Sequence, residues 1–304
     1  MKRKNVLVIM LTLLLTGCSR QKDDGIIRTE WSHTYDGFPV VYVAQNVSAE
    51  GILSVYESLE VSFDGVAAMK LSKTDTDFSW AGLIEKLSES LDDPVVVDAP
   101  SSVDFSDYGC TIILSHFRSH EAAGFNGAVK QTAGISAKPE TSRLSAGSCN
   151  LEILAEKGKQ TVDSLAGHIL YINVMDRATI ESAGVILPET NTYDIGILAS
   201  YDPVALDQAC IDLVSVLKEG APLLSHIEAC SGLSTLTYGE QFGLGCRSYA
   251  MCHDDPESMK AGARLSGFLK IKLHKSIKEK EADAVFHQKK IASAFCCLQR
   301  TIII

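Results

Sequence analysis

The chain has 304 residues, of which 46% are hydrophobic and 22% are charged, as in an ordinary soluble globular protein. These values exclude a largely disordered, collagen-like or multi-span membrane protein, and the length allows a substantial buried core. The formal net charge of −10 excludes a nucleic-acid-binding surface over the whole protein, so no nucleic-acid partner is expected.

The amino terminus has the pattern of a bacterial lipoprotein signal. Basic residues at 2–4 precede an apolar run over 6–15, which is too short for a transmembrane helix but suits a signal-peptide core. The run ends in the letters L-T-G-C, which resemble a lipobox whose cysteine is Cys18. We therefore predict a signal peptide over 1–17 and a lipid on Cys18 that anchors the chain to the cell membrane, outside the cytoplasm. The alternatives are an ordinary secretory signal with a chance cysteine, or a buried first strand.

After a linker over 18–37, residues 38–255 are predicted to form a single α/β domain. Apolar, β-branched runs alternate with helical patterns, and Ser48 and Asp202 have the character of helix N-caps. Because the runs are apolar on both faces, we expect a largely parallel sheet flanked by helices. Strands are expected at 38–44, 66–71, 94–99, 110–117, 168–175 and 195–200, and helices after Ser48, at about 80–91 and 151–166, and after Asp202.

Residues 256–304 are predicted to be a separate basic extension. Beyond Pro256, ten Lys or Arg residues stand against four acidic ones, a net charge of +6. The extension is either poorly ordered or an amphipathic helix on an anionic membrane.

The eight cysteines after Cys18 are scattered and include no C-x-x-C spacing, which excludes a zinc ribbon or a thioredoxin motif. Most are expected to be small buried hydrophobic residues, with a redox or cluster role as the alternative.

The segment after the 110–117 run carries the candidate site, because ligands gather at the carboxyl ends of parallel strands. His116 and His120 are four residues apart, and imidazole suits a transition metal or a proton-transfer role. Gly124 and Gly127 would let a ligand approach the backbone, and Lys130 would hold an anion. No third metal ligand is visible nearby, so a turn with ordinary surface histidines is the alternative. Neither a P-loop nor a G-x-G-x-x-G or G-x-S-x-G motif occurs.

Several segments resemble the domain of unknown function 362 family, over about residues 40–250. They are V-Y-V-A-Q-N-V-S-A-E-G-I (41–52), I-I-L-S-H-F-R-S-H-E-A-A-G-F-N-G-A-V-K (112–130), I-L-Y-I-N-V-M (169–175), D-I-G-I-L-A-S-Y-D-P-V-A-L-D-Q-A-C (194–210) and E-Q-F-G-L-G-C-R-S-Y (240–249). Members often accompany ferredoxin-type iron–sulfur modules or carry their own cysteines, so the resemblance implies a redox- or metal-linked role without a substrate.

The resemblance places functional positions residue by residue. They are His116 and His120 as metal ligands, Gly124, Gly127, Lys130, Asn173 and Asp207 as cofactor-binding residues, and Asp202, for which helix capping is preferred. For Asn173 the alternative is to tie down a loop, and for Asp207 it is to lie in solvent.

The chain departs from the family pattern in its short connection before the S-H-F strand, its basic extension and its lack of cysteines over 176–193. An iron–sulfur cluster is therefore not expected, which leaves a transition metal as the cofactor considered.

Two hypotheses follow. The first is a membrane-anchored, metal- or redox-linked protein with its pocket at His116 and His120. The second is a non-catalytic surface lipoprotein that binds a small molecule or a protein partner, or a truncated inactive paralogue. Metal that is lost when both histidines are replaced would separate the two, and no named enzymatic reaction is predicted.

Overall fold

The computed structural model describes residues 26–73, 78–97, 103–135, 150–188, 194–253 and 301–303. The expected signal peptide, Cys18 and residues 254–300 lie outside the described residues. Within the described part, no helix is long and apolar enough to span a membrane.

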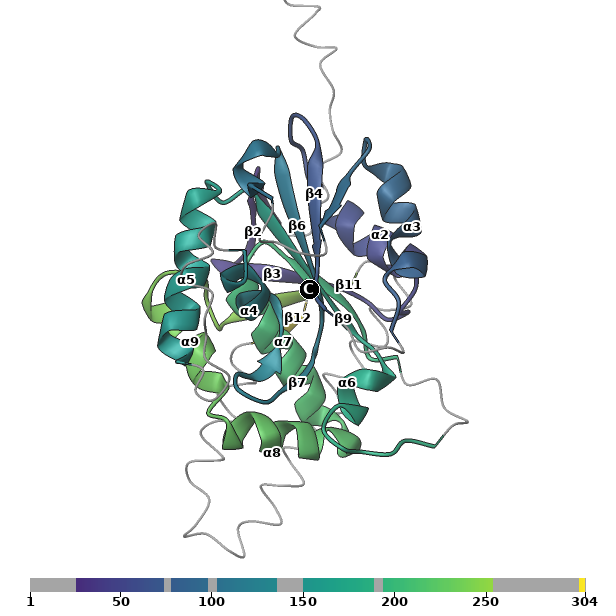
Figure 1. Ribbon diagram of the computed structural model, residues 1–304, viewed down its shortest axis with the longest axis vertical. Coiled ribbons are helices and arrows are strands. Elements are labelled where there is room, and N and C mark those ends of the chain that lie inside the picture. Colours follow the sequence, from purple (N-terminus) through teal and green to yellow (C-terminus); the bar gives the residue numbers. More distant parts are fainter. Residues whose placement is uncertain are drawn as a thin grey trace, which may run out of the picture.

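The described strands build a ten-stranded sheet whose core is mostly parallel, as predicted (Figure 1). The strands of its core lie side by side in the order β5 (Val95–Val97), β4 (Ala67–Leu71), β6 (Cys110–His116), β9 (Ile169–Met175), β10 (Gly196–Ser200) and β3 (Phe38–Ala44). The first four of these strands are parallel, and β10 is antiparallel to both of its neighbours. Consequently β4, β6 and β9 all end at the same edge of the sheet, here called the carboxyl edge.

Short strands extend this sheet at the β3 side. Residues 26–35 fall in the predicted linker but form a hairpin of β1 (Ile26–Thr29) and β2 (Ser32–Tyr35), which continues antiparallel into β3. Asp36 and Gly37 both have positive φ, the geometry of a tight two-residue hairpin turn. On the same side, β11 (Tyr249–His253) runs parallel to β3, and β12 (Thr301–Ile303), within the basic extension, runs parallel to β11.

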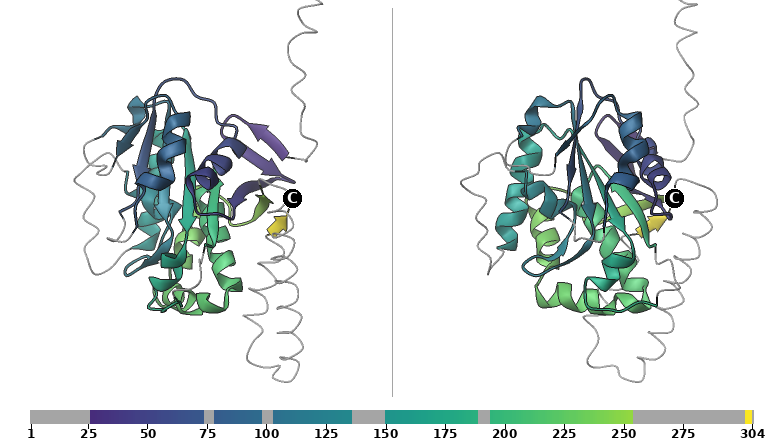
Figure 2. Two further views of the ribbon diagram at one scale, coloured as in Figure 1. Left: turned by 90° about the vertical axis from the view of Figure 1, so that its right-hand side faces the viewer. Right: turned by 45° about the vertical axis from the view of Figure 1, so that its right-hand side comes forward.

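Helices cover both faces of the sheet (Figures 1 and 2). One face packs against α2 (Ala49–Ser58) and α3 (Ala81–Ser90), and the other carries α4 (Ala128–Ala133), α5 (Leu151–Ser164), α7 (Pro203–Val216), α8 (Ala221–Ala229) and α9 (Leu233–Gln241). We call the second the α7 face. A small hairpin of β7 (Arg118–His120) and β8 (Gly124–Asn126) packs against α8.

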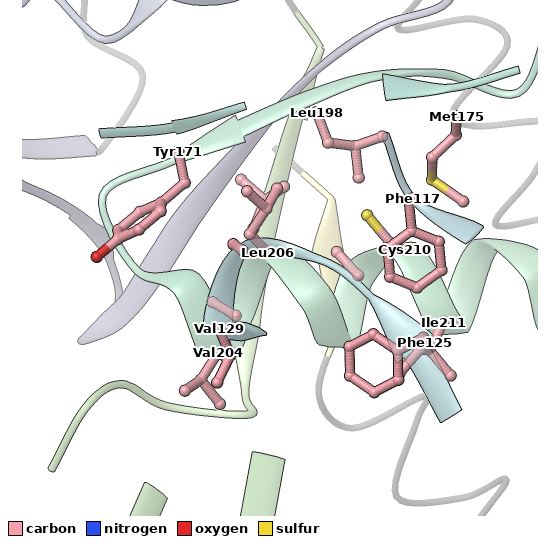
Figure 3. Packing of buried hydrophobic residues seen from close by; sticks show 14 of the residues in the cluster. Phe117, Phe125, Val129, Tyr171, Met175, Leu198, Val204, Leu206, Cys210 and Ile211 are labelled. Carbon is pink, nitrogen blue, oxygen red and sulfur yellow. The ribbon is translucent and has the colours of Figure 1, made fainter. Parts of the chain in front are cut away.

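Helix α7 is the central element of its face. Nearly all of its residues are buried, and they include the polar side chains of Asp207, Gln208 and Asp212. Figure 3 shows Phe117 and Phe125, which stack with ring centroids 5.5 Å apart, beside Cys210 and Ile211 of α7. The helix starts as predicted, because Asp202 Oδ1 accepts the backbone N–H groups of the first turn at 2.9 and 2.8 Å.

Candidate functional site

His116 is the last residue of β6 and is held in one orientation. Its Nε2 lies 2.8 Å from Oδ1 of Asp176, which follows β9 at the same edge. Burial raises the pKa of Asp176, but hydrogen bonds from His116 and from the first N–H groups of α6 (Arg177–Glu181) bring it below its usual value. Because an ionised carboxylate only accepts hydrogen bonds, the His116 Nε2 carries the proton. Phe78 stacks on the ring at 4.0 Å, and Nδ1 is buried with no partner among the described residues.

His120 ends β7 and is a neutral imidazole. Its Nδ1 accepts the backbone N–H groups of Ala122 and Ala123 at 3.3 and 3.2 Å, which leaves the proton on Nε2. Burial lowers the pKa of His120 to about 4, and the positive charges of Lys130 and Arg118 lower it further in the same direction.

The two histidines do not form a metal centre with the residues described. One ring nitrogen of each is already hydrogen-bonded, and no group of three or more His, Cys, Asp or Glu side chains in the described ranges is placed to hold a metal ion. The metal role of His116 and His120 therefore remains a prediction from sequence. Of the cysteines in the described ranges, Cys110 and Cys210 are buried as expected, whereas Cys230, Cys246 and Cys252 are only partly buried.

Three of the predicted binding residues, Asp207, Asn173 and Gly127, meet in one buried contact, here called the Asp207 anchor. The Asp207 carboxylate accepts the N–H of Ala128 at 2.7 Å, the N–H of Val129 at 2.9 Å and the side-chain amide of Asn173 at 2.8 Å. A Cβ on Gly127 would lie 2.4 Å from Asp207 Oδ1, so glycine is needed for this close approach. The carboxylate thus fixes the start of α4 to α7 and β9, a structural task that accounts for its hydrogen bonds.

Gly124 has a comparable packing task. Its φ of +80° favours glycine, and an added Cβ would lie 3.0 Å from Gly232 Cα in the turn between α8 and α9. The glycine brings the β7–β8 hairpin against this turn.

Lys70, which the sequence analysis missed, is buried in β4 with only 4% of its surface exposed. Its Nζ donates to Oε1 of Gln131, and no carboxylate in the described ranges forms an ion pair with it. Gln131 Nε2 and Lys130 Nζ both donate to Asn126 Oδ1, at 2.5 and 3.1 Å. Asn126 in turn donates to the backbone carbonyl of His116 at 2.9 Å, so a single polar network joins β4, α4 and the end of β6. A lysine inside the apolar run A-A-M-K-L was the available signal.

Three cations lie in one region of the carboxyl edge, because Lys70 and Lys130 are joined through Gln131 and Asn126, and Arg118 pairs with Asn126 across the β7–β8 hairpin. Burial lowers the pKa of Lys70 to about 7, and the nearby charge of Lys130 adds to this effect. Lys130 and Arg118 also act together on His120. We call Lys70, Lys130 and Arg118 the cation cluster, and it stands out in a chain whose net charge is −10.

Comparison with known families identifies the region around this site. Residues 83–212 match the family model described as Domain of unknown function (DUF362). This region belongs to the DUF362 family. The search of curated proteins and the search of solved structures found no match to the chain.

The DUF362 match covers most of the candidate site but not all of it. It includes both histidines, the Asp207 anchor and two members of the cation cluster, whereas Lys70 precedes it. The family resemblance inferred from sequence is therefore confirmed for this region, and Lys70 is supplied by a strand outside the match.

Proposed function

We propose that the protein is a lipid-anchored, extracytoplasmic binding protein that holds a small oxyanion at the cation cluster. The lipobox ending in Cys18 supports the anchoring, and the DUF362 match is consistent with a function that is not yet characterised. The observation that carries the anion proposal is Lys70, a buried cation without a carboxylate partner among the described residues.

An anion would relieve an unfavourable arrangement of charge. Burying an unpaired ammonium costs free energy, and a second positive charge nearby increases that cost. A ligand carboxylate or phosphate about 4 Å from one ammonium would gain about 4 kcal/mol at the effective dielectric constant of a partly buried site. The cluster also lies at the carboxyl ends of parallel strands, where α/β proteins commonly bind ligands.

Calorimetric titration of the full-length chain in detergent tests the proposal, with phosphate, acetate and glyoxylate at low ionic strength. We expect at least one of these anions to bind and the Lys130→Met variant to bind it at least tenfold more weakly. Lys86→Met is the matched control, because it removes the same charge from an exposed ion pair with Glu50 on the opposite face of the sheet. Equal affinities in wild type and Lys130→Met, or no binding of any of the three anions, would refute the anion site.

Anchoring has its own test. Metabolic labelling with a radioactive fatty acid should mark the wild-type chain in a bacterial host, and Cys18→Ala should remove the label and release the protein from the membrane fraction. A Cys18→Ala chain that keeps its label would contradict the anchor.

A metal-binding function is supported by one observation. Histidines that bind metals usually give their second ring N–H to a carboxylate, as His116 does to Asp176. Mass spectrometry of metals in anaerobically purified protein tests this alternative. About one transition metal per chain, lost in the His116→Ala/His120→Ala variant, would favour a metal-linked role over simple anion binding.

A further inference from the structure

We propose that the amine of Lys70 is a nucleophile that forms an imine with a small oxo acid, whose carboxylate is held by Lys130 and Arg118. This inference rests on the proposed anion site and adds a covalent step to it. The ligand class is an aldehyde or ketone that carries a carboxylate close to its carbonyl carbon.

The surroundings of Lys70 are those that activate an amine. Its side chain is almost wholly buried, its hydrogen-bond partner is the neutral amide of Gln131, and the nearby charged group is another lysine, Lys130. Burial and a neighbouring cation both favour the unprotonated amine, which is the nucleophilic form. These effects lower the pKa of Lys70 to about 7, so the neutral, nucleophilic amine is populated at physiological pH.

Two buried polar atoms on the neighbouring strands point to a ligand at the same place. Lys70 pairs with Ile113 across β4 and β6, and Ser115 is two residues further on, so Lys70 and Ser115 share the α7 face of the sheet. Ser115 in turn pairs with Asn173 of β9 on that face. Ser115 Oγ and Asn173 Oδ1 are both buried and have no hydrogen-bond partner among the described residues. Since buried polar atoms are normally paired, both are available to a bound molecule.

The proposed reaction needs no oxidant or reductant. The lone pair of Lys70 Nζ forms a bond to the carbonyl carbon while the carbonyl π electrons move to its oxygen. A proton transfers from the nitrogen to that oxygen to give a carbinolamine, and loss of water then gives the imine. Ser115 Oγ can donate a hydrogen bond to the oxygen, and Asn173 Oδ1 can accept one from the hydroxyl that forms.

Reductive trapping tests the inference on the full-length chain in detergent. The protein is incubated at pH 7 with glyoxylate and cyanoborohydride, which reduces an imine to a stable secondary amine, and the modified lysines are located by peptide mass spectrometry. We expect Lys70 to be labelled at least tenfold faster than Lys86, whose exposed amine is paired with Glu50. With acetaldehyde, which lacks the carboxylate, the ratio of the Lys70 labelling rate to the Lys86 labelling rate should be much smaller.

The dependence on pH and on Ser115 separates a reactive amine from a merely buried one. Labelling of Lys70 should reach half its maximum near pH 7, whereas that of Lys86 should rise only at more alkaline pH. Ser115→Ala should slow the labelling of Lys70 about tenfold and leave its pH midpoint in place.

The outcomes also separate this inference from the proposed function. Glyoxylate that binds by calorimetry without labelling Lys70 would overturn the imine and leave the anion site standing. If glyoxylate neither binds nor labels while phosphate or acetate binds, the oxo-acid class is wrong. If none of the three anions binds and Lys70 is not labelled, both proposals fail. None of these outcomes requires a Lys70 variant.

Discussion

The contact between Gly127 and Asp207 yields the sharpest prediction about stability. Asp207 is fully buried, and its carboxylate holds the first two N–H groups of α4 together with the amide of Asn173. We expect Gly127→Ala and Asp207→Ala each to destabilise the fold strongly, and the double variant to be much more stable than the sum of the two effects predicts.

The magnitudes follow from the geometry. Asp207→Ala removes three hydrogen bonds to a buried carboxylate and leaves their donors unpaired, at about 1–3 kcal/mol each. The substitution also removes the cost of burying the charged carboxylate, so we expect a net loss of about 4 kcal/mol. The φ of Gly127 is −160°, which alanine adopts freely. The cost of Gly127→Ala therefore comes from its Cβ, which would lie 2.4 Å from Asp207 Oδ1. The carboxylate must retreat by about 1 Å, which stretches both bonds to α4 beyond hydrogen-bond range and costs about 3 kcal/mol.

Urea unfolding followed by far-ultraviolet circular dichroism measures these changes. In the Asp207→Ala background the added methyl group meets no carboxylate, so Gly127→Ala should cost less than about 1 kcal/mol, a coupling of about 2 kcal/mol or more. Gly82→Ala is the matched control, because nothing lies within 4 Å of its Cβ position in α3, and it should stabilise the fold by about 0.5–1 kcal/mol. Additive losses from the two substitutions, within about 0.5 kcal/mol, would show that the glycine is not required by the carboxylate.

Three further predictions concern the carboxyl edge. Asp176→Ala should reduce the free energy of unfolding by about 2–3 kcal/mol at pH 7, because it removes the N-cap of α6 and the partner of His116 Nε2. Folding lowers the pKa of Asp176 below its usual 3.8, so the ionised carboxylate stabilises the fold above that pH. The difference between variant and wild type in urea titrations should therefore shrink as the pH falls below the usual 3.8. The pKa of His120 falls from 6.5 to about 4 on folding, so the unfolded chain takes up the proton first, and the free energy of unfolding should decline as the pH is lowered from 6.5 towards 4. In a His120→Gln variant the free energy of unfolding should depend less steeply on pH over this range. An equal slope in variant and wild type would contradict the buried neutral ring. Gly124→Ala should reduce the free energy of unfolding by about 2 kcal/mol and lower the midpoint of thermal unfolding, because of its φ of +80° and its contact with Gly232. An unchanged midpoint would mean that the hairpin shifts without cost.

Local signals in the sequence predicted most of the fold. Asp202 followed by Pro203 indicates a helix start, and Asp202 indeed caps α7. The apolar runs at 110–117 and 168–175 correspond to β6 and β9 within one residue at either end. The hairpin at 26–35 was missed because each of its strands has only four residues and its alternation is weak.

The candidate site was only partly predictable because its contacts are distant in sequence. Asp207 contacts a backbone N–H 79 positions earlier, and Lys70 contacts a side chain 61 positions later. Composition and periodicity carry no information on such pairs, so neither the contacts of Asp207 nor the environment of Lys70 could be derived from the sequence. The prediction that polar groups gather where parallel strands end was more robust, because it depends on chain direction and not on individual contacts.

The antiparallel strand β10 has a consequence for how the chain can be divided. Its outer neighbour is β3, at residues 38–44, and the outer neighbour of β6 is β4, at 67–71. Both neighbours precede the 83–212 segment that matches the family. If residues 83–212 were produced on their own, β6, β9 and β10 would form a three-stranded sheet with unpaired backbone groups along both edges. Strand β5 would lack β4, the strand with which it pairs. Such edges recruit strands from other chains, so the excised segment would aggregate. The region that matches the family thus lacks two of the strands with which its own strands pair.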